Sequence, residues 1–249
     1  MIRRASVATP RHRRRASDGD RRQRRTSAFL FDLDGTLVDS AYEHALTWRN
    51  AFRLAGVDAP TWKIHRQVGM SGGLLTQAVL AEIGADLSPE IVERVKEIHT
   101  REYEKVVDDV HPLPGSKELL DHLTRLDIPW MIATSSRATN ARRTLKKLGF
   151  TSLDVAVTRD DVERAKPDPD LFLAAARRLR VPIAGSMVVG DSVWDILAAR
   201  RAGAFGVGLL SGGTSREELE SAGALRVYEG PADLLRHLHE LGVRPVMSS

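Results

Sequence analysis

The stretch Asp32-Leu33-Asp34-Gly35-Thr36-Leu37 follows the apolar run 28–31 and lies where a buried strand is expected to end. Asp32 and Asp34 are two residues apart, so on a regular strand their side chains would point to the same face. Gly35 and Thr36 then allow a turn. Two carboxylates at the end of a buried strand are costly to desolvate unless a cation or a proton accompanies them. The stretch therefore predicts an Mg²⁺-assisted phosphoryl-transfer site, with an Asp-rich surface turn as the alternative.

Three further segments follow in a fixed order, each at the end of a predicted strand or at the start of a predicted helix. They read Ala133-Thr134-Ser135, Lys166-Pro167-Asp168 and Gly190-Asp191-Ser192-Val193-Trp194-Asp195. Together with 32–37 they resemble the four motifs of the haloacid dehalogenase superfamily, over roughly residues 27 to 245. The resemblance implies a phosphatase of the subfamily with a helical cap in the first insertion position, the C1 cap, similar to phosphoglycolate phosphatases.

The order of helical and strand patterns predicts the fold. From residue 116 onward, short apolar runs alternate with helical stripes, which predicts an α/β fold with a Rossmann-like, doubly wound parallel sheet. Residues 41–110 carry helical stripes and no strand pattern. We therefore expect a Rossmannoid core at 27–44 and 112–249, an inserted all-helical cap at 45–111, and a return linker at 111–115.

The charge of the chain is unevenly spread. Its net charge is +4, but residues 1–26 contain ten arginines against Asp18 and Asp20, so the remainder is mildly acidic. The first 26 residues contain too few large apolar side chains for a core, and we expect a disordered basic tail. A mis-assigned start codon is the plain interpretation of this tail; organelle targeting or a nucleic-acid contact are the alternatives. The charge of the body gives no support for nucleic-acid binding.

Two absences in the sequence limit the function classes. The chain has no cysteine, which excludes disulfides, a thiolate nucleophile and sulfur-ligated metals. No apolar run approaches the length needed to span a membrane. We therefore expect a cytoplasmic protein without a membrane partner.

The resemblance implies a role for each motif residue. Asp32 would be the nucleophile that forms an aspartyl-phosphate, and Asp34 would act first as general acid and then as general base. Lys166 would neutralise the transferring phosphoryl group. Thr134 and Ser135 would bind phosphoryl oxygens. Ser136, which follows them, is equally well explained as a helix N-cap.

The resemblance also implies an Mg²⁺ site. The ion would be held by Asp32, Asp191 and the main-chain oxygen of Asp34, and this all-oxygen set excludes a zinc-type site. Asp195 would orient Lys166 or a water molecule. It lies four residues after Asp191 and would share its face if a helix began at once.

The cap carries weaker signals. His44 and Trp48 recur at a spacing also found in the family's phosphosugar mutases, although a partly buried helix face explains them as well. The loop 68–73, which contains Ser71, is expected either to close over substrate or to be an ordinary turn. Mutases of the family carry an arginine in this loop for a second phosphate. This chain has Arg66 before the loop and no arginine in it.

We therefore expect Mg²⁺-dependent hydrolysis of a small phosphorylated metabolite, a phosphomonoester, through an aspartyl-phosphate. The alternative within the enzyme class is a β-phosphoglucomutase-like phosphosugar mutase. From another class, the alternative is a nucleic-acid-binding or regulatory protein that acts through the Arg-rich tail. The intact set of Asp32, Asp34, Lys166 and Asp191 disfavours an inactive enzyme. The substrate and the oligomeric state stay open.

Overall fold

Six parallel strands form the central sheet in a computed structural model of the chain, which describes residues 28–243. The sheet order is β5-β4-β1-β6-β7-β8. The strands are β1 (Phe29–Phe31), β4 (Trp130–Ala133), β5 (Ala156–Val157), β6 (Met187–Gly190), β7 (Phe205–Leu209) and β8 (Ala224–Tyr228). The predicted parallel sheet is confirmed. Strand β5 is short, because the Leu153 carbonyl accepts from the Ala156 N–H in a turn that leads into it.

Alternate residues along the strands pack against helices on opposite faces of the sheet. On β1, Phe29 and Phe31 join a cluster with α5 (Ser116–Arg125), α6 (Ala138–Lys147) and α10 (Pro231–Arg236). Leu30, between them, packs instead with α7 (Asp170–Leu179) and α8 (Val193–Ala202). α9 (Arg216–Ala222) covers β7 and β8. Because both faces are covered, the carboxyl ends of the strands are the edge left for a site.

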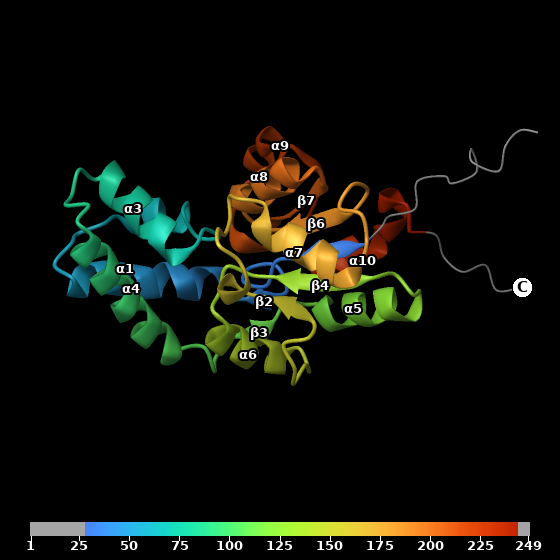
Figure 1. Ribbon diagram of the computed structural model, residues 1–249, viewed down its shortest axis with the longest axis horizontal. Coiled ribbons are helices and arrows are strands. Elements are labelled where there is room, and N and C mark those ends of the chain that lie inside the picture. Colours follow the sequence, from blue (N-terminus) through green and yellow to red (C-terminus); the bar gives the residue numbers. More distant parts are fainter. Residues whose placement is uncertain (1–27, 244–249) are drawn as a thin grey trace, which may run out of the picture.

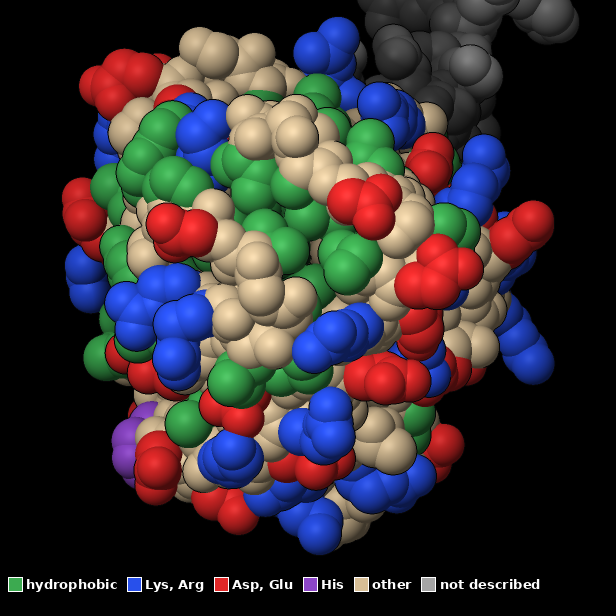
Figure 2. All heavy atoms as spheres, turned by 90° about the vertical axis from the view of Figure 1, so that its left-hand side faces the viewer, with side chains coloured by type: hydrophobic (Ala, Val, Ile, Leu, Met, Phe, Trp, Pro, Cys, Tyr) green, Lys and Arg blue, Asp and Glu red, His purple; other side chains and the backbone are tan. Residues whose placement is uncertain are grey.

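A second region, on the left in Figure 1, consists of helices with a hydrophobic core of their own. It contains α1 (Ala41–Leu54), α2 (Thr61–His65), α3 (Gly72–Glu82) and α4 (Pro89–Glu104). The Ser88 hydroxyl caps α4 by accepting the Ile91 N–H, and Pro89 occupies the first turn. Helix α2 was not predicted, because five residues are too short to show a stripe. Figure 2 looks at this end of the molecule, where apolar side chains reach the surface between charged ones.

The two chain segments between core and cap run side by side. β2 (Val38–Asp39) and β3 (His111–Pro112) pair antiparallel, and the Leu113 N–H donates to the Leu37 carbonyl at 3.0 Å. The return linker expected at 111–115 therefore begins as a strand. The expected division at 44/45 falls inside α1, which begins at Ala41, and the core (27–44, 112–249) and cap (45–111) bounds remain a proposal.

Two expectations concern the ends of the chain and membranes. The basic tail at 1–26 lies outside the described residues, as do 244–249. Within residues 28–243, none of the helices is both long enough and apolar enough to cross a bilayer.

Candidate active site

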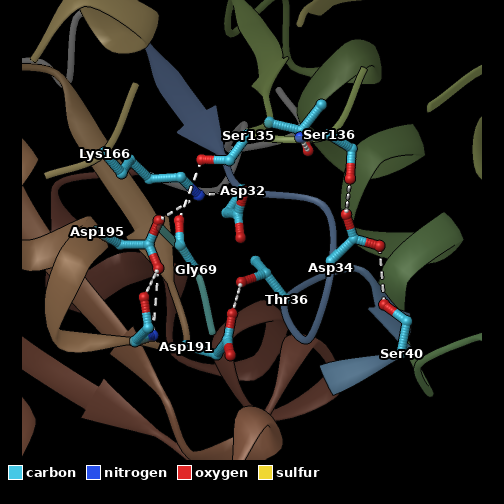
Figure 3. Close-up of polar contacts among 12 residues, drawn as sticks. Asp32, Asp34, Thr36, Ser40, Gly69, Ser135, Ser136, Lys166, Asp191 and Asp195 are labelled. Carbon is cyan, nitrogen blue, oxygen red and sulfur yellow. Dashed lines mark hydrogen bonds and ion pairs between the residues drawn. The ribbon is translucent and has the colours of Figure 1, made fainter. Parts of the chain in front are cut away.

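Lys166 and Asp32 form the buried centre of the site. Asp32 follows β1 directly, and its N–H donates to the Val189 carbonyl of β6 at 2.8 Å. The Lys166 Nζ lies 2.5 Å from Asp32 Oδ1 and 2.8 Å from Asp195 Oδ1, as Figure 3 shows. Burial alone would lower the pKa of Lys166, but these two carboxylates more than offset it and raise that pKa. The lysine is therefore an ammonium held between two acids.

Carboxylates outnumber this lysine. Oxygens of Asp32, Asp191 and Asp195 all lie within 4.8 Å of one another, and all three residues are buried. Burial raises the pKa of Asp191 to about 7, and the charge of Asp195 adds to the shift. Burial also raises the pKa of Asp32, against the opposing effect of Lys166. An excess of buried negative charge of this kind is relieved by a cation.

The surroundings of Asp191 fit an Mg²⁺ ion. A Cβ added at Gly212 would lie 1.7 Å from Asp191 Oδ2, and one added at Gly35 would lie 2.5 Å from it, so two glycines make room for this carboxylate. Thr36 Oγ1 donates to Asp191 Oδ1 at 2.8 Å and orients it. The group offers oxygen ligands alone, which suits a hard divalent cation.

Asp195 joins the cluster with Asp32 and Asp191 through a different local structure from the one expected. Helix α8 begins at Val193, with Ser192 as N-cap, so Asp191 and Asp195 share no helical face. Asp195 instead forms a capping box, in which its Oδ2 accepts the Ser192 N–H at 3.2 Å, and the same oxygen also accepts from the Ser192 hydroxyl at 2.6 Å. Its other oxygen, Oδ1, then faces Lys166.

Asp34 points away from the other carboxylates (Figure 3). Its Oδ1 and Oδ2 accept from the hydroxyls of Ser40 and Ser136, both at 2.8 Å, and His44 Nε2 lies 3.4 Å from Oδ1. The expected shared strand face is wrong, because β1 ends at Phe31 and Asp34 lies in the turn that follows. Burial would raise the pKa of Asp34, but His44 and the two hydroxyls outweigh it and lower that pKa to about 2.

The segment after β4 brings three hydroxyl residues to one cavity. Thr134 Oγ1 accepts the Ser136 N–H at 3.0 Å, and Ser135 Oγ donates to the Gly69 carbonyl of the cap at 3.0 Å. Arg137 is the N-cap residue of α6, so the N-cap interpretation of Ser136 is wrong. Nothing in the local sequence indicated that Ser136 would bind Asp34.

This cavity, the main cavity hereafter, lies between core and cap and measures about 380 Å³. Asp32, Asp34, Thr134, Ser135 and Lys166 line it from the core, and His44, Trp48 and Ser71 line it from the cap. Three further cations, Lys96, Arg137 and Arg159, also line it. None of these three was singled out from the sequence, because none belongs to a motif. The absence of a cation from loop 68–73 therefore does not leave the cavity without cations.

Rings from α1 and α4 stack in a column at the cap side. His44 stacks on Tyr103 at 4.0 Å between centroids, and Trp48 stacks on His99 at 3.7 Å. His44 Nδ1 and His99 Nε2, 3.5 Å apart, link the two halves. Burial is the main cause that lowers the pKa of His99 well below its usual value. His99 and Tyr103 were missed, although their four-residue spacing on a helix was a usable signal.

Arg66 lies outside the main cavity. Its guanidinium pairs with Glu218 of α9, and its carbonyl accepts from Trp194 Nε1 at 3.0 Å. The structure thus brings His44 and Ser71 to the main cavity but does not bring Arg66 there.

A buried Asp-Lys-Asp cluster at the carboxyl ends of a parallel sheet, covered by a helical cap, defines a class of phosphoryl-transfer hydrolases. The model of the haloacid dehalogenase-like hydrolase family matches residues 26–203, and the chain belongs to this family. The expected resemblance and the expected enzyme class are confirmed.

Relatives of known name include phosphatases and a mutase. Hexitol phosphatase A of Escherichia coli is 35% identical over 182 residues, 72% of this chain and 81% of that protein. A phosphoglycolate phosphatase of Xylella fastidiosa is 35% identical over 76% of this chain and 82% of its own length. β-Phosphoglucomutase of Bacillus subtilis is 31% identical over 74% of this chain and 84% of its own length. Among solved structures, a hydrolase from Pseudomonas syringae superposes with a TM-score of 0.85 at 48% identity, covering 87% of this chain and all of that one.

Proposed function

We propose that this protein is an Mg²⁺-dependent phosphatase that hydrolyses a small phosphomonoester through an aspartyl-phosphate on Asp32. The observation that carries the proposal is the position of Asp32, which lines the main cavity and pairs with Lys166, while Asp195 holds Lys166 in turn. A buried carboxylate fixed by a lysine beside an open cavity is available as a nucleophile.

In the first half-reaction, an Asp32 oxygen attacks phosphorus and the bond between phosphorus and the ester oxygen breaks. Asp34 gives its proton to the departing ester oxygen, and the alcohol leaves. Because His44, Ser40 and Ser136 favour the ionised form of Asp34, substrate must weaken these contacts before Asp34 carries that proton.

In the second half-reaction, Asp34 takes a proton from a water molecule whose oxygen attacks phosphorus. The bond between phosphorus and Asp32 breaks, which yields inorganic phosphate and the free carboxylate. Lys166 balances the negative charge of Asp32 and of the phosphoryl oxygens in both steps. Thr134 and Ser135 bind phosphoryl oxygens from the adjoining wall of the main cavity.

Asp32, Asp191 and the main-chain oxygen of Asp34 would hold the Mg²⁺ ion, and Asp195 would position Lys166. When bound, the ion supplies positive charge that draws the phosphoryl group toward Asp32 and lowers the repulsion between two anions.

The substrate is proposed to be a small phosphorylated metabolite with a hydroxylated carbon chain. Support comes from the relatives, whose names include a hexitol phosphatase, and from the polar side chains Ser71, Thr100 and Asn140 in the lining of the main cavity. A volume of about 380 Å³ fits a metabolite of this size. A metabolite substrate and a cysteine-free chain agree with the cytoplasm as the expected compartment.

A phosphosugar mutase is the second candidate. The relation to β-phosphoglucomutase favours it, and so do Lys96, Arg137 and Arg159, which offer positive charge for a second phosphate in the main cavity. Loop 68–73 still lacks the arginine expected of a mutase, and we rank hydrolysis first.

Screening a panel of phosphorylated metabolites for phosphate release tests the proposal. We expect release from sugar or polyol monophosphates in Mg²⁺, loss of release in EDTA, and none with the Asp32→Asn variant. Release that persists in EDTA or in Asp32→Asn would contradict the proposal. A purified protein inactive on every class of phosphomonoester would also contradict it.

A further inference from the structure

The two carboxylates proposed to share the metal, Asp32 and Asp191, line different cavities. Asp32 lines the main cavity, as do Asp34 and Lys166. Asp191 instead lines a second cavity of about 250 Å³, formed by residues 65–68 of the cap, the start of α8, and residues 212–214 and 218 of the core. The proposed metal position thus lies between two spaces whose linings, among the described residues, share Val68 alone.

Gly69 separates these spaces. It has a φ of +102°, and a Cβ added there would lie 2.5 Å from Ser192 Oγ and 3.3 Å from Trp194 Cδ1. Its carbonyl accepts from Ser135 Oγ on the side of the main cavity. The cap backbone therefore packs tightly on the core at this point and divides one space from the other.

The two cavities differ in charge. Besides its carboxylates, the main cavity is lined by four cations: Lys96, Arg137, Arg159 and Lys166. The second cavity is lined by Asp191 and Glu218, and its one cation among the described lining residues, Arg66, pairs with Glu218. The four cations of the main cavity face three carboxylates, Asp32, Asp34 and Asp160, whereas Asp191 is left unbalanced in the second cavity once Arg66 pairs with Glu218. The second cavity is therefore the more favourable of the two for a divalent cation.

An exposed ion pair forms part of the lining of the second cavity. The Arg66 side chain is 57% exposed and the Glu218 side chain 31% exposed, and their contact joins cap to core. Long exposed side chains of this kind rearrange at little cost and without movement of the backbone around them.

We propose that the second cavity is the path by which the divalent cation and its water exchange with solvent, and that the Arg66–Glu218 pair gates it. The metal could then be replaced while substrate fills the main cavity. The inference rests on the proposed metal site and goes beyond it, since it assigns a role to residues outside the main cavity.

Stopped-flow release of Mn²⁺ into a fluorescent chelator tests the gate. Mn²⁺ takes the same oxygen ligands as Mg²⁺ and reports without turnover. We expect Arg66→Ala and Glu218→Ala each to speed both association and release by about fivefold, the scale of one surface ion pair, with the equilibrium Kd unchanged. If the two variants change Kd and the association rate in opposite directions, the charges of Arg66 and Glu218 act directly on the cation, and the proposal that the pair is a gate fails.

Two bulky variants test the path itself. Thr214→Trp narrows the second cavity and should slow Mn²⁺ exchange by at least about tenfold. Gly73→Trp is the matched control in the lining of the main cavity, where an added Cβ meets nothing within 4 Å. Slower exchange in Gly73→Trp but not in Thr214→Trp would place the path in the main cavity and overturn the inference.

A remaining route for release of the cation is movement of the whole cap away from the core. Arg143 and Asp108, 2.7 Å apart, form another ion pair between core and cap. Arg143→Ala should leave exchange unchanged; if it speeds exchange as much as Arg66→Ala, the cation escapes by cap opening and the inference fails. Circular dichroism and melting curves establish that each variant is folded. A wild-type protein that binds no Mn²⁺ at equilibrium would overturn the proposed function as well, which separates the two failures.

Discussion

Asp32 is buried against Lys166, and this contact decides what happens when its carboxylate is replaced. We predict that Asp32→Asn lowers turnover by about four powers of ten or more, because an amide does not attack phosphorus. The fold should persist, since the variant removes one of several buried negative charges. Steady-state phosphate release and a melting curve check both parts. Wild-type turnover in a clean preparation of the variant would rule out Asp32 as nucleophile.

Among the neighbours that lower the pKa of Asp34, His44 has the largest effect. Since the pKa of Asp34 lies at about 2, below its usual value near 3.8, its ionised form stabilises the fold above pH 4, and this stabilisation is lost as pH falls toward 2. In His44→Asn the effect of burial should prevail and raise that pKa to its usual value near 3.8 or above, which removes roughly 2 kcal/mol of stability above pH 4. The two proteins should converge in stability near pH 2.

Carbon-13 NMR titration of the Asp34 carboxyl measures this shift. His111→Asn replaces an exposed histidine and is the control, with no change expected. A midpoint near pH 2 in His44→Asn would show that the hydroxyls of Ser40 and Ser136 suffice without the imidazole.

At the scale of elements, the cap contacts the core through a loop that tolerates no side chain at one position. Gly69 has a positive φ, and a Cβ there would collide with Ser192 Oγ. We predict that Gly69→Ala lowers kcat at least tenfold by holding the cap off the core, with little change in melting temperature. Gly73→Ala, a few residues along the same segment with open space around its Cβ, should behave as wild type. Equal kinetics for both variants would show that this contact does not matter for turnover.

Also at the scale of elements, the positions of strand ends could be predicted from the sequence, whereas contacts between distant segments could not. Three of the four motifs follow a short apolar run, so Asp32, Thr134 and Asp191 could be placed at strand ends, and their shared sheet edge followed from parallel topology. The direction of Asp34 could not be predicted, because it depends on a turn and on Ser136, 102 residues away. The Ser88-Pro89 pair is a local signal for the start of helix α4, but which face of that helix meets α1 depends on packing between distant segments.

Main-cavity cations outside the motifs could not be predicted from local sequence patterns. Arg137 and Arg159 come from two separate core segments, and Lys96 of α4 joins them in one cavity because the cap lies over the core. Nothing in their neighbours distinguishes them from surface cations. For the same reason Arg66 was considered as a substrate residue, whereas its partner is Glu218 of the core.

For the whole molecule, the first 26 residues are the part most different in composition from the rest. We predict that deleting residues 1–26 leaves the melting temperature and phosphatase kinetics nearly unchanged, because so few apolar side chains are removed. Binding to DNA or RNA that weakens with salt and is lost on deletion would support the alternative nucleic-acid role. A marked fall in melting temperature would show that the segment contributes to the fold.

The fate of the phosphoryl group tests the central claim. Rapid acid quenching with a ³²P-labelled sugar or polyol monophosphate follows the label from substrate to protein to product. We predict that labelled protein forms, that the label maps to Asp32, and that it decays to inorganic phosphate with no bisphosphate activator present. A label that never appears on the protein, or one that passes to a second sugar molecule and not to water, would contradict the account.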